Sequence, residues 1–158
     1  MSVCQLRPES RGHVRIQSND PLEPPAMQPN YLSTSNDRST LISGIRLARR
    51  LAATRALAPY VKSEYRPGAA AESDDDLLEF ARNTGGTIFH PSGTCKMGNI
   101  ERDPTAVVDS ELKVHGISAL RVVDCSIMPV LVSGNTNVPV VMIAEKAADL
   151  ILAAAQRH

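Results

Sequence analysis

The feature that most constrains the fold is an apolar stripe in the segment VPVVMIAEKAADLILAAAQRH, which runs to the C-terminus. Its members recur at helical spacing and are Val140, Ile143, Ala147, Leu150 and Ile151. Pro139 suits the first turn of such a helix, because backbone N–H groups in that turn have no hydrogen-bond partner within the helix. Proline, which lacks the N–H, therefore loses no helical hydrogen bond there. The pattern predicts a helix from about residue 139 with one face that must pack against other parts of the structure.

Two further helices and a strand are predicted in the first half of the chain. In GHVRIQS, Val14 and Ile16 fall on one face of an alternating pattern, which indicates a short strand, and prolines 21 to 29 then favour an extended loop. Residues 37–56 carry apolar side chains at helical spacing, with arginines largely on another side that we expect to face solvent or a neighbouring domain.

The second of these helices is predicted from its start and stop signals. In SDDDLLEFARNTGG, Ser73 is a candidate N-cap, and Asp76 lies three residues on, as in a capping box. Gly85 and Gly86 are expected to end the helix. The run of three aspartates could suggest a metal site, but acidic residues at the positive end of the helix dipole explain it more simply. We therefore predict no metal site.

A buried strand is predicted in the second half, where LRVVDCSIMP contains a short apolar run from Leu120 to Val123. Asp124 follows this run directly, and ligands of parallel sheets gather at the carboxyl ends of strands. Asp124 is therefore a candidate ligand contact, although an aspartate that merely starts a turn is an equally ordinary interpretation. Helices together with short strands predict an α+β fold.

Composition excludes several functional classes. The 158 residues carry 17 Lys and Arg against 17 Asp and Glu, with no Trp, two Phe and three Tyr, so neither a basic surface nor stacking platforms indicate nucleic acid. The longest apolar runs are interrupted by polar residues, which predicts no membrane span, and no secretory signal is visible at the N-terminus. Three scattered cysteines favour reduced thiols, and we expect a cytoplasmic location.

One histidine stands out in the segment FHPSGTCKMG. His90 lies between turn-forming residues, which predicts a tight loop, and imidazole suits proton transfer near neutral pH. An ordinary surface or packing histidine is the alternative. A thiol hydrolase using Cys95 with His90 is a further alternative, but five residues of separation do not guarantee contact. Asn135, Thr136 and Asn137 precede the last helix, whose N-terminus favours negative charge, although Asn137 could simply be its N-cap.

Three segments together resemble the glucose–methanol–choline (GMC) family of flavin oxidoreductases, and most closely its choline-dehydrogenase-like alcohol dehydrogenases. The segments are FHPSGTCKMG, LRVVDCSIMP and SGNTNVPVVMIAEKAADLI, and the resemblance extends from about Leu6 to the last helix. It implies the C-terminal part of a two-domain flavoenzyme. Residues 1–88 would form a substrate-domain segment with a sheet and helices. Residues 89–158 would carry the catalytic loop and the strand and helix that return to the FAD domain.

The resemblance also implies a cofactor and a set of site residues. The cofactor is FAD and the substrate a small alcohol, with His90 facing the flavin as the base for the hydroxyl proton while a hydride passes to the flavin. Asn135 matches the family's second active-site residue and, being unable to act as a base, would donate a hydrogen bond to the same oxygen. The cofactor-binding positions implied are Asp124, Cys125, Asn137, Val138 and Pro139.

The family's ADP-binding turn is not found in this sequence. No three of the nine glycines match the spacing GxGxxG, in which glycines let the backbone approach a pyrophosphate. We therefore expect the N-terminal, ADP-binding half to be absent here and to be supplied in cis or by another chain. The alternative is a non-catalytic fragment or partner-binding module with no activity of its own.

Overall fold

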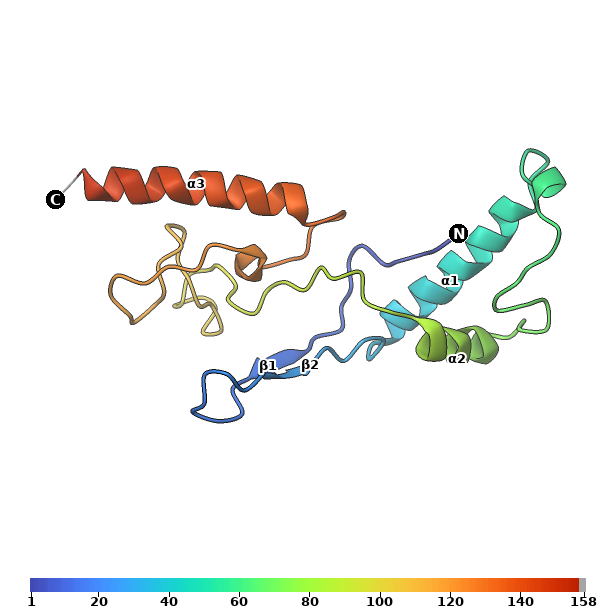
Figure 1. Ribbon diagram of the computed structural model, residues 1–158, viewed down its shortest axis with the longest axis horizontal. Coiled ribbons are helices and arrows are strands. Elements are labelled where there is room, and N and C mark those ends of the chain that lie inside the picture. Colours follow the sequence, from blue (N-terminus) through green and yellow to red (C-terminus); the bar gives the residue numbers. More distant parts are fainter. Residues whose placement is uncertain (157–158) are drawn as a thin grey trace. The chain divides into compact units, whose positions relative to one another are not determined.

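The computed structural model describes residues 1–156. The chain forms two compact units, Met1–Thr87 and Ile88–His158. In Figure 1 the first unit contains a small hairpin and two helices, and the second contains one long helix above irregular chain. The predicted α+β fold class is confirmed. The assignment of the two segments to a substrate domain and an FAD domain remains a prediction.

The hairpin of the first unit joins β1 (His13–Arg15) to β2 (Ala26–Gln28). The strands are antiparallel, and Val14 lies opposite Met27. The strand predicted from the alternating pattern is therefore confirmed. β2 was not predicted, because its three residues lie between prolines that indicate a loop, and only pairing with β1 makes the segment a strand.

Helix α1 (Ser35–Ala52) is anchored at its first turn by Asp37. The Thr34 hydroxyl accepts a hydrogen bond from the Asp37 N–H at 3.2 Å and so caps the helix. The Asp37 side chain is buried and accepts from the N–H groups of Glu9 (2.9 Å) and Ser10 (2.8 Å). The N-terminal segment is thus fastened to the start of α1 by a carboxylate.

Helix α2 (Asp74–Thr84) follows a short 3₁₀ turn, η1 (Ala58–Tyr60), and has the predicted capping box. Ser73 accepts from the Asp76 N–H at 3.1 Å, and Asp76 accepts from the Ser73 N–H at 3.0 Å. The helix ends at Thr84, directly before the predicted glycines. The side of α1 predicted to face solvent or another domain is partly paired within this unit, because Arg46 contacts Asp74 at 2.5 Å.

The two helices of this unit pack against each other. The buried apolar residues that they carry are Ile42, Leu77 and Ala81.

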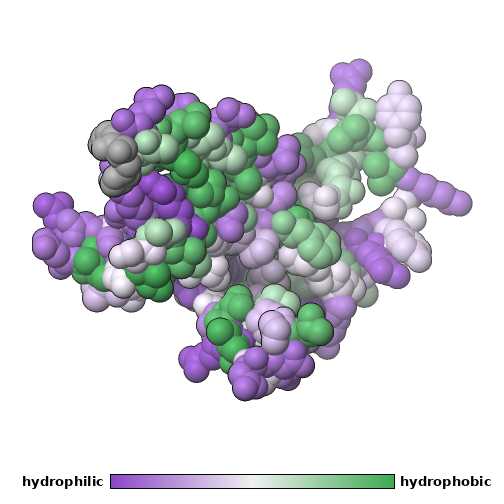
Figure 2. Space-filling view, turned by 60° about the vertical axis from the view of Figure 1, so that its left-hand side comes forward, coloured by the Kyte–Doolittle hydropathy of each residue, from purple (hydrophilic) through white to green (hydrophobic). Residues whose placement is uncertain are grey.

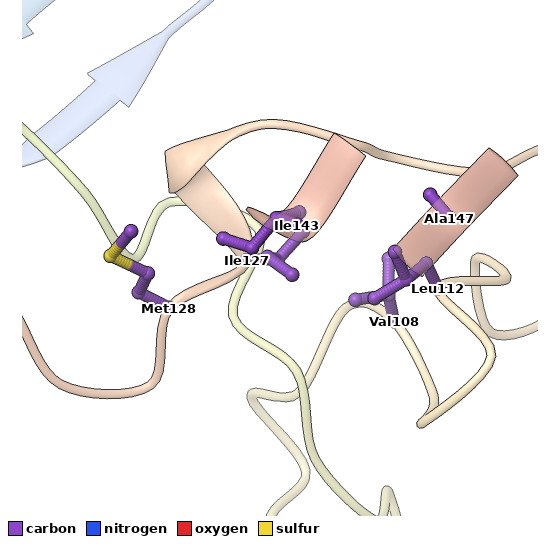
Figure 3. Close-up of a cluster of buried hydrophobic side chains, with 6 residues drawn as sticks. All are labelled: Val108, Leu112, Ile127, Met128, Ile143 and Ala147. Atoms are coloured by element: carbon purple, nitrogen blue, oxygen red, sulfur yellow. The ribbon is translucent and has the colours of Figure 1, made fainter. Parts of the chain in front are cut away.

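The second unit is built around helix α3 (Asn137–Ala155), which lies on an irregular layer. Its predicted stripe supplies Ile143 and Ala147 to a buried cluster with Val108, Leu112, Ile127 and Met128. Figure 3 shows Ile127 against Ile143, and Val108 and Leu112 beside Ala147. Ile127 comes from a 3₁₀ turn, η2 (Cys125–Ile127). The predicted helix is confirmed, with its start two residues before Pro139.

The strand predicted at Leu120–Val123 is wrong. Arg121 forms a single isolated bridge with Lys113, and residues 122 and 123 belong to no strand. The apolar run instead packs against the buried cluster through Val122 and Val123. The apolar character of this run therefore reflects packing of irregular chain. Among residues 1–156, the run joins no sheet whose carboxyl edge could place Asp124 at a crevice.

Several apolar side chains of α3 remain on the surface. Val138 is 75 % exposed, and Val141, Met142 and Leu152 are also exposed. Figure 2 shows apolar residues at the surface among polar ones. Within the described residues, no helix is long and apolar enough to cross a membrane.

Candidate active site

The loop that carries His90 is held by backbone contacts to η2. The Cys95 N–H donates to the Ser126 carbonyl at 3.0 Å, and the Met97 N–H donates to the Ile127 carbonyl at 2.8 Å. Gly93 has a φ of +82°, and a Cβ there would lie 3.3 Å from the Met128 carbonyl oxygen. Glycine is favoured at this turn because other residues rarely adopt that backbone conformation without strain. The predicted tight loop is thereby confirmed.

His90 lies between two side chains of the segment that precedes α3. Its Nδ1 atom is 2.8 Å from the Thr136 hydroxyl, and its Nε2 atom is 3.3 Å from the Asn135 side-chain oxygen. Thr136 is only 6 % exposed, whereas the ring of His90 is half-buried and Asn135 is exposed. The fold thus brings together His90 and Asn135, and it adds Thr136, which was not among the predicted site residues.

The N-cap of α3 lies one residue before Asn137, the residue that the sequence offered as a possible N-cap. Thr136 is the N-cap and Asn137 is the first helical residue, so the interpretation of Asn137 as N-cap is wrong. The Val140 N–H donates to the Thr136 carbonyl at 2.9 Å. The N–H groups of Asn137 and Val138 have no hydrogen-bond acceptor among the described residues. These exposed donors at the positive end of the helix dipole suit an electron-rich group such as the edge of a flavin.

Asp124 and Cys125 have local partners. Asp124 is exposed, caps η2 and accepts from the Ser126 N–H at 2.7 Å, which agrees with its interpretation as a turn-starting residue. The Cys125 thiol donates to the carbonyl of Pro91 at 3.1 Å, and Pro91 directly follows His90 in the chain. Their predicted contact with a cofactor remains a prediction.

The other candidate residues make no second site. In His90, Nδ1 contacts Thr136 and Nε2 contacts Asn135, and neither nitrogen hydrogen-bonds Cys95, which does not favour a Cys–His hydrolase. His115 is half-buried and bonds the Gly98 carbonyl through Nε2 at 3.1 Å, a packing contact. No group of three potential His, Cys, Asp or Glu metal ligands occurs in residues 1–156.

Comparison with known proteins decides the family. The family model for GMC oxidoreductase, in its C-terminal part, matches residues 8–144. The chain belongs to this family. An alcohol dehydrogenase [acceptor] of Pseudomonas putida is 45 % identical over 152 residues, which are 96 % of this chain and 27 % of the relative. The mitochondrial choline dehydrogenase of Mus musculus is 49 % identical over 149 residues, which are 94 % of this chain and 25 % of the relative.

Solved structures of the GMC fold agree with this membership. A pyridoxine 4-oxidase from Mesorbium loti matches with a TM-score of 0.84 and 35 % identity over 91 % of this chain and 28 % of its own. A formate oxidase from Aspergillus oryzae, studied for FAD modification, matches with a TM-score of 0.88 and 33 % identity over 96 % of this chain and 26 % of its own. The chain spans about a quarter of the length of these proteins.

Proposed function

We propose that this GMC oxidoreductase segment supplies the proton-transfer residues for FAD-dependent oxidation of a small alcohol to an aldehyde or ketone. The observation that carries the proposal is the arrangement of one half-buried imidazole, His90, against the Asn135 amide at 3.3 Å. An imidazole and an amide side by side can bind the same substrate oxygen, the first as base and the second as donor.

His90 has the role of general base in this proposal. Alcohol oxidation requires removal of the hydroxyl proton, and imidazole is the side chain best suited to accept it near neutral pH. Asn135 cannot accept a proton, but its amide N–H can donate to the oxygen as negative charge develops there. The half-buried ring of His90 and the exposed amide of Asn135 allow a substrate to approach from the Asn135 side.

The cofactor of the proposal is FAD, which supplies the hydride acceptor when bound. Asn137, Val138 and Pro139 begin α3, and the unpaired N–H groups of the first two fit an electron-rich ring edge. Asp124 and Cys125 are proposed as further contacts, held in place by η2 and by the Pro91 carbonyl. The chain therefore offers donors at one helix end and a turn beside the His90 loop.

The test measures anaerobic reduction of the flavin by a primary alcohol in a single turnover. This segment is first joined to an FAD-binding region, in cis or as a second chain. His90→Ala is expected to slow reduction by about a hundredfold or more, the usual scale for loss of a positioned base. Asn135→Ala is expected to slow it by less, because the base remains.

Two other histidines serve as controls. His13→Ala removes an exposed residue of β1, and His115→Ala removes the packing contact to Gly98, so neither should change the rate substantially. Reduction of the flavin at the unmutated rate in His90→Ala, together with slow reduction in His115→Ala, would show that His90 is not the base.

A further inference from the structure

We infer that Thr136 is a positioning residue, whose hydroxyl holds the Nδ1 side of His90 so that Nε2 faces the substrate. This inference rests on the proposed role of His90 as base. The contact between Thr136 Oγ1 and His90 Nδ1 is 2.8 Å, whereas Nε2 is 3.3 Å from Asn135. The first distance is that of a firm hydrogen bond, and the second is longer than the usual N–H···O range. A substrate oxygen can therefore displace the Nε2 contact more easily than the Nδ1 contact.

The Thr136 hydroxyl is available to His90 because it makes no capping bond to α3. A threonine at an N-cap ordinarily accepts a hydrogen bond from the N–H of the second or third helical residue. In α3 the third helical residue is Pro139, which has no N–H. The second, Val138, does not donate to the Thr136 side chain, which therefore makes no capping bond. Its backbone has helical φ and ψ of −83° and −10°, unlike the extended backbone of an ordinary N-cap. The hydroxyl instead contacts an imidazole 46 residues away in the chain.

The position of the proton follows from the base role. A neutral imidazole carries one proton, and Nε2 can accept another only when that proton is on Nδ1. Thr136 Oγ1 then accepts the Nδ1–H bond, as an orienting group does for other catalytic histidines. The Asn135 side-chain amide can flip by about 180° around its Cβ–Cγ bond. The flip exchanges the positions of its oxygen and its NH₂ group, so that the NH₂ group can face Nε2 or the substrate oxygen.

The contact is also well held. Thr136 is 6 % exposed, and its carbonyl accepts the first backbone bond of α3 from Val140. On the other side, the residue after His90 is fastened to Cys125 through the Pro91 carbonyl. The backbone on each side of the contact is therefore held by a neighbouring hydrogen bond, which favours a preorganised base.

The first experiment reads the tautomer of His90 by ¹⁵N NMR of the imidazole nitrogens in the full 158-residue chain. It is made at alkaline pH, where imidazoles are uncharged, and His90→Gln assigns the signals. We expect Nδ1 to carry the proton in the unmutated chain and in Thr136→Ser, and the Nε2–H form to increase in Thr136→Val. Thr94→Val, the same change at an exposed threonine of the His90 loop, should leave the spectrum unchanged.

His115 is the internal reference for this measurement, because its bond to the Gly98 carbonyl lies in the same unit. Unchanged His115 signals in each variant show that the unit has kept its fold. A predominant Nε2–H form in the unmutated chain would overturn the inference. So would a His90 tautomer that is the same in Thr136→Val as in the unmutated chain.

The second experiment is the flavin-reduction assay at saturating alcohol. Thr136→Val should lower the limiting rate by about 3- to 10-fold, the range expected for one neutral hydrogen bond. Thr136→Ser should stay within about twofold, and the alcohol concentration giving half the limiting rate should not change. If His90→Ala is slow but Thr136→Val reduces the flavin at the unmutated rate, the positioning role alone is refuted. If His90→Ala is fast, the proposed function itself fails.

Discussion

Asp37 is expected to control the attachment of the N-terminal segment to α1, and Asp37→Asn tests this. One carboxylate oxygen accepts from the Glu9 N–H at 2.9 Å, and the other accepts from the N–H of Ser10 at 2.8 Å and from its hydroxyl. The Ser10 hydroxyl also accepts from the Ser33 N–H at 3.1 Å. An asparagine keeps one acceptor oxygen, but its NH₂ group takes the place of the second carboxylate oxygen and faces the donors that this oxygen accepts from in the unmutated chain.

The magnitude follows from these contacts. A hydrogen bond to a charged group contributes about 1.5–3 kcal/mol, and an unsatisfied buried donor costs a similar amount. Asp37 is only 3 % exposed, which limits the access of water to the donors that lose their acceptor. Asp37→Asn removes the acceptor of one of these hydrogen bonds and weakens the other by removing the charge. The free energy of local unfolding should therefore fall by about 2–4 kcal/mol. This corresponds to about 30- to 700-fold faster exchange of the Glu9 and Ser10 amide hydrogens.

The effect should depend on pH in a definite direction. Burial alone would raise the pKa of Asp37, but the hydrogen bonds from Glu9 and Ser10 outweigh it and lower the pKa. A lowered pKa in the folded state means that the ionised carboxylate stabilises the fold above the unfolded-state pKa of about 4. That stabilisation is lost as the pH falls through the folded-state pKa. The difference between Asp37→Asn and the unmutated chain should therefore be full at pH 7 and shrink well below pH 4.

The assay is hydrogen exchange followed by NMR, with protection factors corrected for the intrinsic rate at each pH. Glu79→Gln is the matched control, because Glu79 is an exposed carboxylate on α2 of the same unit. It should leave the protection of the Glu9 and Ser10 amides within about twofold. Protection in Asp37→Asn equal to that of the control at pH 7 would refute the anchoring role, as would a difference that grows on acidification.

Two further predictions concern the two helix-bearing units separately. Ser73→Ala removes one half of the capping box of α2 and should cost about 1 kcal/mol, seen as faster exchange of amides in the first turn of α2 and not of α3. Val108→Ala removes two methyl groups from a fully buried side chain beside Ala147 and should cost about 2–3 kcal/mol in denaturant unfolding, whereas Val130→Ala, at an exposed position, should cost much less.

The elements that could be predicted from the sequence are those whose signals are local. Ser73 and Asp76 satisfy each other's backbone within three residues, so the pattern itself describes the start of α2. Pro139 and the stripe through Ile143 and Ala147 likewise describe α3 by its own turns and by the face that packs. In each case the free energy that selects the structure comes from neighbours in the chain or from one face of one helix.

The elements that were missed depend on a partner elsewhere in the chain. β2 exists because its residues pair with His13–Arg15, and three residues between prolines contain no sign of that pairing. The run Leu120–Val123 has strand composition but bridges only Lys113, so its apolar side chains serve the buried cluster instead. Strand formation is decided by pairing, and composition shows only that side chains are suited to burial.

The candidate site combines both kinds of information. His90 and Asn135 were proposed from the motifs in which they stand, and the fold brings their side chains together although 45 residues separate them. Thr136 was missed because it is one of three polar residues before the last helix, among which Asn137 was the candidate N-cap. A partial signal was Pro139 at the third helical position, which removes one of the two backbone donors that an N-cap hydroxyl ordinarily accepts from. A capping residue deprived of its cap bond, one position from a proposed active-site amide, has its hydroxyl available for another partner, and here that partner is the imidazole of His90.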